Sequence, residues 1–86
     1  MFMLLAPQRA ANPEGFVVQV ASRESVEYIE GAERYAVEVD FGQSVGVYVH
    51  TLKSVSGRLL SQDKSNLIIS RILDGLRAMG CKTELC

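Results

Sequence analysis

Apolar and polar residues alternate from residue 16 to residue 50, and this alternation predicts β-strands. Strands are expected over residues 16–20, 26–30, 34–41 and 45–50. In the third, Tyr35, Val37, Val39 and Phe41 share one side. Glycine-containing turns separate the strands, and Gly31 suits a tight hairpin. Because each strand has one apolar side, we expect an antiparallel sheet with one face in water.

The apolar spacing changes to that of an amphipathic helix after residue 61. Ser61 or Asp63 is expected to cap its start, and Gly80 to follow its end. Residues 81–85 alternate again and predict a short final strand, while residues 53–61 indicate a bend or a further short strand. The apolar helix stripe consists of Leu67, Ile68, Ile69, Ile72, Leu73, Leu76 and Met79.

These elements predict an α+β fold: an antiparallel sheet of four to six strands, one amphipathic C-terminal helix on one face, then the final strand. Residues 1–15 carry the only two prolines and are expected to be an N-terminal tail, so that residues 16–86 form a single domain. One helix covers only part of such a sheet, and we expect the tail or a second subunit to cover the rest. The expected core is Val37, Val39, Val47, Val49, Ile68, Ile72, Leu76 and Leu85.

Composition excludes several classes of protein. With 86 residues, 48% of them hydrophobic, the chain fits one small globular domain. It shows no membrane-spanning run and no signal peptide, so a cytoplasmic location is expected. The net charge of −1 argues against nucleic acid as a partner. A single histidine with Cys81 and Cys86 does not supply a zinc site, so no metal or cofactor is expected; Cys86 is interpreted as a free thiol or an intermolecular link.

Charge is distributed unevenly along the chain. Residues 1–51 contain three arginines and seven acidic residues, a balance of −4, whereas residues 52–86 have a balance of +3. The acidic residues are a solvated outer face or a recognition face for a basic partner. In the second case the expected partner-binding residues are Glu27, Glu30, Glu33, Glu38, Asp40, Tyr48 and His50.

His50 is the only histidine and is expected on the outer side of its strand, beside Tyr48. Glu38 or Asp40 on the neighbouring strand is a carboxylate within reach across the ladder. Because an open sheet does not exclude water, we expect no catalytic residues and no enzyme activity. A small enzyme or ligand-binding protein built around His50 remains the less favoured alternative.

Three stretches of the chain resemble a known family: residues 35–42 (YAVEVDFG), 45–55 (VGVYVHTLKSV) and 68–80 (IISRILDGLRAMG). Together with the closing strand, they resemble immunity protein 74 of bacterial polymorphic toxin systems, over residues 26–86. The resemblance implies a cytoplasmic protein that binds and neutralises a cognate toxin domain, without catalytic residues of its own. If the toxin is a basic nuclease, an acidic hairpin could occupy its cleft as a phosphate mimic.

Self-assembly is a second hypothesis, and it is compatible with the first. In this interpretation the open sheet face or an edge strand forms a homodimer, and the chain is a structural or adaptor module. It predicts an apolar patch on the outer surface and a dimer that depends on concentration.

Overall fold

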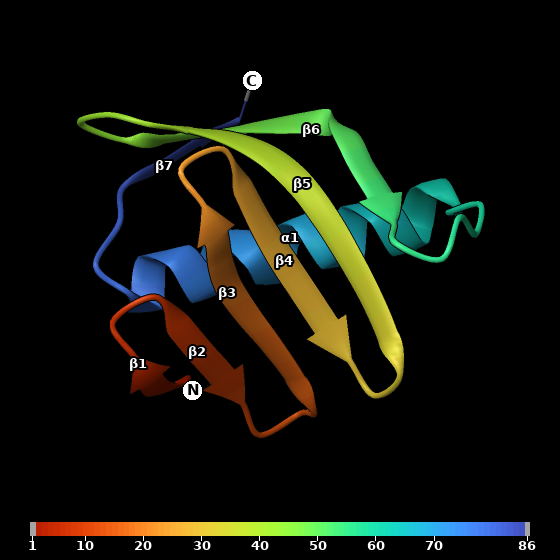
Figure 1. Cartoon of the computed structure of the whole chain (residues 1–86), viewed down its shortest axis with the longest axis horizontal. Coiled ribbons are helices and arrows are strands. Elements are labelled where there is room, and N and C mark those ends of the chain that lie inside the picture. The colour runs from red at the N-terminus through yellow and green to blue at the C-terminus, as the bar shows by residue number, and fades with distance from the viewer. Residues whose placement is uncertain (1, 86) are drawn as a thin grey trace.

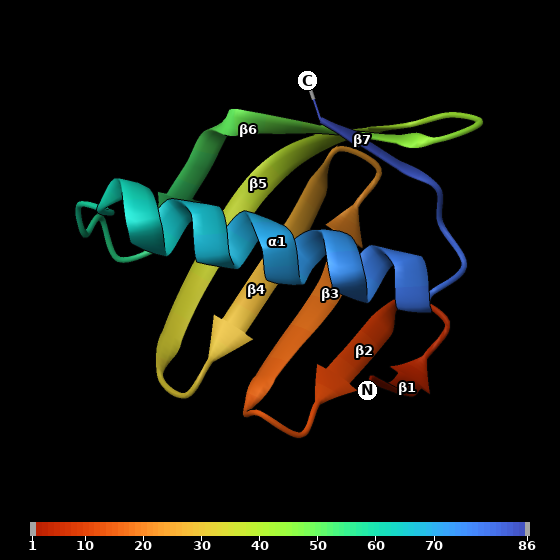
Figure 2. The same ribbon diagram turned by 180° about the vertical axis from the view of Figure 1, so that it is seen from behind.

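The computed structural model describes residues 2–85 and shows a curled seven-stranded sheet with one helix across it (Figure 1). The strands lie side by side in sequence order. They are β1 (Met3–Ala6), β2 (Arg9–Asn12), β3 (Phe16–Ser22), β4 (Ser25–Glu30), β5 (Glu33–Phe41), β6 (Val45–Ser54) and β7 (Thr83–Leu85). The helix α1 (Gln62–Ala78) crosses one face of the sheet diagonally (Figure 2). The expected α+β class with a C-terminal helix is confirmed.

The sheet is mixed and not purely antiparallel, and seven strands exceed the expected four to six. Each neighbouring pair from β1 to β6 is antiparallel, because short turns connect consecutive strands. β6 and β7 are parallel because α1 lies between them and carries the chain back to the end at which β6 began. Val45 is therefore opposite Thr83, and Val47 is opposite Leu85.

The prediction of an N-terminal tail is wrong for residues 3–12, because these residues form β1 and β2. Pro7 lies in the turn that joins these two strands, and Pro13 lies in the turn that leads to β3. Both prolines thus mark hairpin turns, where they disturb no ladder. The segment extends the sheet, and Phe2 packs edge-on against Phe16 with their ring centroids 5.5 Å apart.

The core lies between α1 and the sheet face turned toward it, here called the helix side. Of the expected core residues, Val37, Val39, Val47, Ile68, Ile72 and Leu76 are buried, as predicted. β3 and β4 add Phe16, Val18, Val26 and Tyr28. Gly75 allows close approach of the helix, because a Cβ placed on it would lie 2.6 Å from the Cβ of Val18.

Both helix ends agree with the sequence prediction. Ser61 is the N-cap, and its hydroxyl accepts a hydrogen bond from the backbone N–H of Lys64. At the other end Gly80 has a φ of +90°, which favours glycine. The N–H of Gly80 donates to the carbonyl of Arg77, and the N–H of Cys81 donates to that of Leu76. These two bonds form a Schellman motif that ends the helix.

Two residues expected in the core are exposed: Val49 by 37% and Leu85 by 61%. The register shift in β6 explains Val49. Lys53 is opposite Ala36 and Tyr48 is opposite Glu38, so residues 49–52 of β6 all correspond to the single residue between those two on β5. The Thr51 hydroxyl accepts from the Glu38 N–H at 2.8 Å and donates to the Tyr48 carbonyl at 2.7 Å, and it thereby holds the bulge. Leu85 is exposed because it lies on the short edge strand β7.

Two further sequence expectations concern the termini and the membrane. Cys81 precedes β7 and is half-buried against the core, whereas Cys86 lies outside the described residues. Among residues 2–85, no helix is long and apolar enough to cross a membrane.

Candidate functional site

The acidic residues of the hairpin formed by β4 and β5 separate onto the two faces of the sheet. Glu30 and Glu33 are opposite each other in the ladder and lie on the helix side, with the buried Tyr28 and Tyr35 at alternate positions. Three acidic residues lie on the outer face: Glu27, Glu38 and Asp40. The expected single acidic face is therefore divided between two environments.

Glu30 belongs to a network that connects the sheet to α1. The hydroxyl of the fully buried Tyr28 donates to a Glu30 carboxylate oxygen at 2.9 Å and accepts from Nη1 of Arg71 at 2.7 Å. Arg71 also forms an ion pair with Glu30 at 3.6 Å, and Lys64 forms another at 3.5 Å. The guanidinium carbon of Arg71 lies 4.5 Å from the ring centroid of Phe16. These contacts hold α1 against β3 and β4.

The network shifts the pKa values of its members. The hydrogen bond from Tyr28, together with the charges of Lys64 and Arg71, holds the pKa of Glu30 below its usual value despite partial burial. Burial, above all, raises the pKa of Tyr28 to about 12, and the hydrogen bond to Glu30 adds to this effect. Glu30 therefore stays ionised and Tyr28 stays neutral at physiological pH, as their hydrogen bond requires.

Glu33 and Glu27 also have partners within the chain. Glu33 accepts a hydrogen bond from the Tyr35 hydroxyl at 2.8 Å and forms an ion pair with Arg58 at 2.9 Å. On the outer face, Glu27 accepts from the side-chain amide of Gln19 at 2.7 Å and lies 3.9 Å from Arg34. These two carboxylates are consequently engaged in intramolecular contacts.

Glu38 and Asp40 remain, and the fold brings a third carboxylate close to them. The turn between β3 and β4 lies beside β5, where the N–H of Val39 donates to the carbonyl of Glu24 at 2.9 Å. We call Glu24, Glu38 and Asp40, with the ring of Tyr48, the acidic corner; they line an open hollow of about 330 Å³ together with Val39. Within residues 2–85, none of its three carboxylates forms an ion pair.

Sequence reasoning did not include Glu24 among the partner-binding residues. Its charge was visible, but its place in a turn gave no information on the strand beside it. For Glu33 a usable signal existed: it lies two residues before Tyr35 and therefore shares the apolar side of that strand.

The structure does not bring His50 together with Glu38 or Asp40 as a possible catalytic group. Its ring centroid is 6.4 Å from that of Tyr48, with the rings nearly perpendicular. Glu38 is opposite Tyr48 and Asp40 is opposite Gly46, whereas His50 falls inside the bulge of β6. Within the described residues, its imidazole forms no hydrogen bond or ion pair with a carboxylate.

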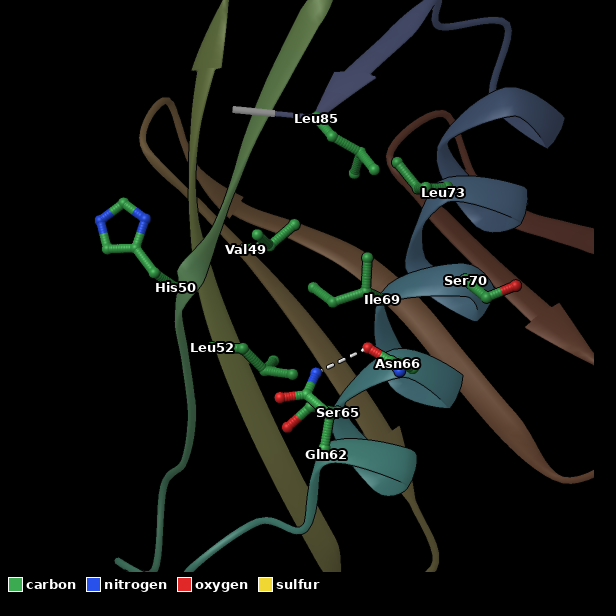
Figure 3. A pocket seen from close by; sticks show the side chains of 10 residues that line it. All are labelled: Val49, His50, Leu52, Gln62, Ser65, Asn66, Ile69, Ser70, Leu73 and Leu85. Atoms are coloured by element: carbon green, nitrogen blue, oxygen red, sulfur yellow. Dashed lines mark hydrogen bonds between the residues drawn. The ribbon is translucent and has the colours of Figure 1, made fainter.

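A second surface feature is an open groove of about 600 Å³ between β6 and α1 (Figure 3). Its apolar lining consists of Val49, Leu52, Ile69, Leu73 and Leu85. Its polar lining consists of Gln62, Ser65, Asn66 and Ser70, together with His50. Gln62 donates to the side-chain oxygen of Asn66 at 2.9 Å. Figure 3 shows that the imidazole of His50 points away from the groove, on the other side of β6 from Val49.

The groove arises from the bulge, which turns Val49 out of the core and toward the helix flank that carries Ile69 and Leu73. Among residues 2–85, its walls carry no Lys, Arg, Asp or Glu, so it suits uncharged apolar groups. Among residues 2–85, no three His, Cys, Asp or Glu side chains are grouped so that they could hold a metal ion.

No protein-family model, no curated protein and no solved structure matches this chain. What the chain does is therefore inferred from its own surface: the acidic corner, the groove and the two edges of the sheet.

Proposed function

We propose that this protein is a non-enzymatic binding protein that holds a basic surface of another protein against the acidic corner. The observation that carries this proposal is the set of exposed carboxylates of Glu24, Glu38 and Asp40, which form no ion pair among residues 2–85. Such a group attracts a positively charged partner and accelerates encounter with it. Tyr48 beside them supplies an aromatic surface of the kind that anchors protein interfaces.

The partner class that fits best is a toxin domain with a basic substrate cleft, and the protein would then act as its immunity protein in the cytoplasm. The resemblance of residues 26–86 to immunity protein 74 supports this class. The position of the acidic corner supports it too, because the corner lies beside the exposed turn that joins β5 to β6. Exposed carboxylates beside such a turn can face the basic wall of a cleft built for phosphates, with no reaction of their own.

Binding is favoured over catalysis by the isolation of His50. A general-base histidine needs a partner that orients it, and the expected carboxylates, Glu38 and Asp40, lie opposite Tyr48 and Gly46 instead. The corner is also open to water, which suits an interface better than a reaction centre.

The test is calorimetric titration of the protein with the toxin domain encoded beside its gene. The double substitution Glu38→Lys/Asp40→Lys should weaken the complex by about a hundredfold, because it places like charges at a desolvated contact. Asp63→Lys/Asp74→Lys is the matched control, since both carboxylates are exposed but lie on α1, on the other side of the sheet. Absence of a complex with the unaltered protein, or an equal loss with the control, would contradict the proposal.

A further inference from the structure

The two edges of the sheet differ in how they are protected. β7 is only three residues long and carries the charged Glu84, with Lys82 just before it. β1 is exposed along its whole length, and residues 2–8 contain no charged side chain. Native proteins usually protect free edges with charges, prolines within the strand or bulges, because an open edge pairs with other strands. The only such feature of β1 is a register irregularity at Leu5.

β1 is also apolar toward both faces of the sheet. Leu4 is opposite Ala10 and lies on the helix side, whereas Met3 is opposite Ala11 and lies on the outer face. Met3, Leu4 and Leu5 are exposed by 67%, 50% and 53%, respectively. Beside them is a hollow of about 290 Å³ lined by Phe2, Met3, Ala11, Asn12 and Pro13. A strand that pairs with β1 must therefore offer apolar side chains on both of its own sides.

We infer that β1 pairs antiparallel with β1 of a second copy of this chain, around a two-fold axis that passes beside Leu4. A second β1 has the required apolar side chains on both sides. In this register Leu4 is opposite Leu4 of the other copy, and this central pair stays on the helix side, whereas Met3 is opposite Leu5, where the register of β1 shifts. A two-fold axis brings identical residues together, and the absence of charge from residue 2 to residue 8 removes the like-charge repulsion that would oppose such a contact.

The pairing closes on itself. An isologous contact uses the same edge on both copies and leaves none of it free, so the product is a dimer and not a fibre. The sheet would run continuously through both copies, with both helices on the same side. The acidic corner lies on β5, β6 and the turn before β4, shares no residue with the hollow beside β1, and stays accessible in the dimer. Homodimerisation is thus independent of the proposed partner binding.

Charge substitution at Leu4 tests both the contact and its register. Sedimentation equilibrium of the unaltered chain should show a dimer that dissociates on dilution. Leu4→Lys and Leu4→Glu should each raise the dimer dissociation constant by at least about tenfold, because like charges then meet across the axis. An equimolar mixture of these two variants should recover the dimer, because opposite charges then meet. Leu59→Lys and Leu59→Glu are matched controls, since Leu59 is fully exposed in a loop.

Recovery in the mixture also separates lost contact from lost folding, because misfolded variants would not recover. If circular dichroism shows that the Leu4 variants are unfolded, Leu5→Lys replaces them, since Leu5 has no partner on β2. A monomer at all concentrations up to about a millimolar, an equal effect of the Leu59 variants, or a mixture that stays monomeric would overturn the inference. Growth into larger oligomers would overturn it as well, because it would indicate pairing of β1 with β7.

Discussion

The hairpin of β4 and β5 carries carboxylates of the same chemical type in two contrasting regions. On the helix side, Glu30 and Glu33 accept hydrogen bonds from tyrosines and pair with Lys64, Arg71 or Arg58. At the acidic corner, Glu38 and Asp40 face solvent, without an ion pair among residues 2–85. The comparison shows what decides whether a carboxylate stabilises the fold or stays exposed. It is the face of the sheet on which the side chain lies, together with the residues next to it on that face.

The two regions should therefore respond differently to substitution. Removing a member of the helix-side network leaves a poorly solvated polar group without a partner, which costs stability. Removing a carboxylate of the acidic corner leaves nothing unpaired inside the molecule.

The largest effect is expected for Arg71→Met. This change removes the donor to Tyr28 and the ion pair with Glu30, and we expect the free energy of unfolding to fall by about 2–3 kcal/mol. Arg34→Met is the matched control, because its contact with Glu27 is long and its side chain is half exposed; the expected loss is about 0.5 kcal/mol or less. Urea denaturation measures both, and equal losses would contradict the contrast.

The second prediction concerns alkaline pH. Burial raises the pKa of Tyr28 to about 12 from an unfolded value of 10.0, so the folded state favours its neutral form. The resulting stability is complete below pH 10 and is lost as pH rises toward 12. Between pH 9 and pH 11 we expect the unaltered chain to lose stability, and Tyr28→Phe to lose about 1.3 kcal/mol less. Some loss should persist in the variant, since burial also raises the pKa of Tyr35. Denaturation midpoints at pH 9 and pH 11 measure the difference, with Tyr48→Phe as the control.

A smaller effect is expected for Glu30→Gln at neutral pH, a loss of about 1 kcal/mol, because the side chain is one-third exposed and water compensates in part. The hydrogen bond from Tyr28 and the nearby cations lower the folded pKa of Glu30 below its unfolded value of 4.5. Its contribution is thus present above that pH and disappears as pH falls through the folded pKa. Thermal melts of the two proteins should therefore converge on acidification; a constant difference down to pH 2 would refute this.

The smallest effect on stability is expected at the acidic corner. Glu38→Gln/Asp40→Asn should change the free energy of unfolding by less than about 0.5 kcal/mol while it weakens binding of a basic partner. A loss as large as that of Glu30→Gln would show that the corner is structural.

Much of the fold was predictable because periodicity is a local property. Alternation located β3 to β6, and Ser61 and Gly80 located the ends of α1, since capping depends on neighbouring residues alone. Because alternate residues of a strand share one face, the sequence of β5 already placed Glu33 beside Tyr35 on the apolar side. β1 and β2 were missed because a segment that contains Pro7 and Pro13 is typical of an irregular tail. Only the pairing of β1 with β2, and of β2 with β3, shows that both prolines lie in turns between strands.

The candidate site was less predictable, because it depends on residues that are distant in sequence. The sequence by itself determined which side chains share a strand face, where the helix begins and ends, and that the first half of the chain is acidic. Only the tertiary structure decided that Arg71 reaches Tyr28 and Glu30, that Glu24 lies beside β5, and that the β6 bulge turns Val49 outward. The physical reason is that a local pattern specifies which side of its own strand or helix a side chain lies on. The residues that this side chain contacts are set by the register and packing between elements.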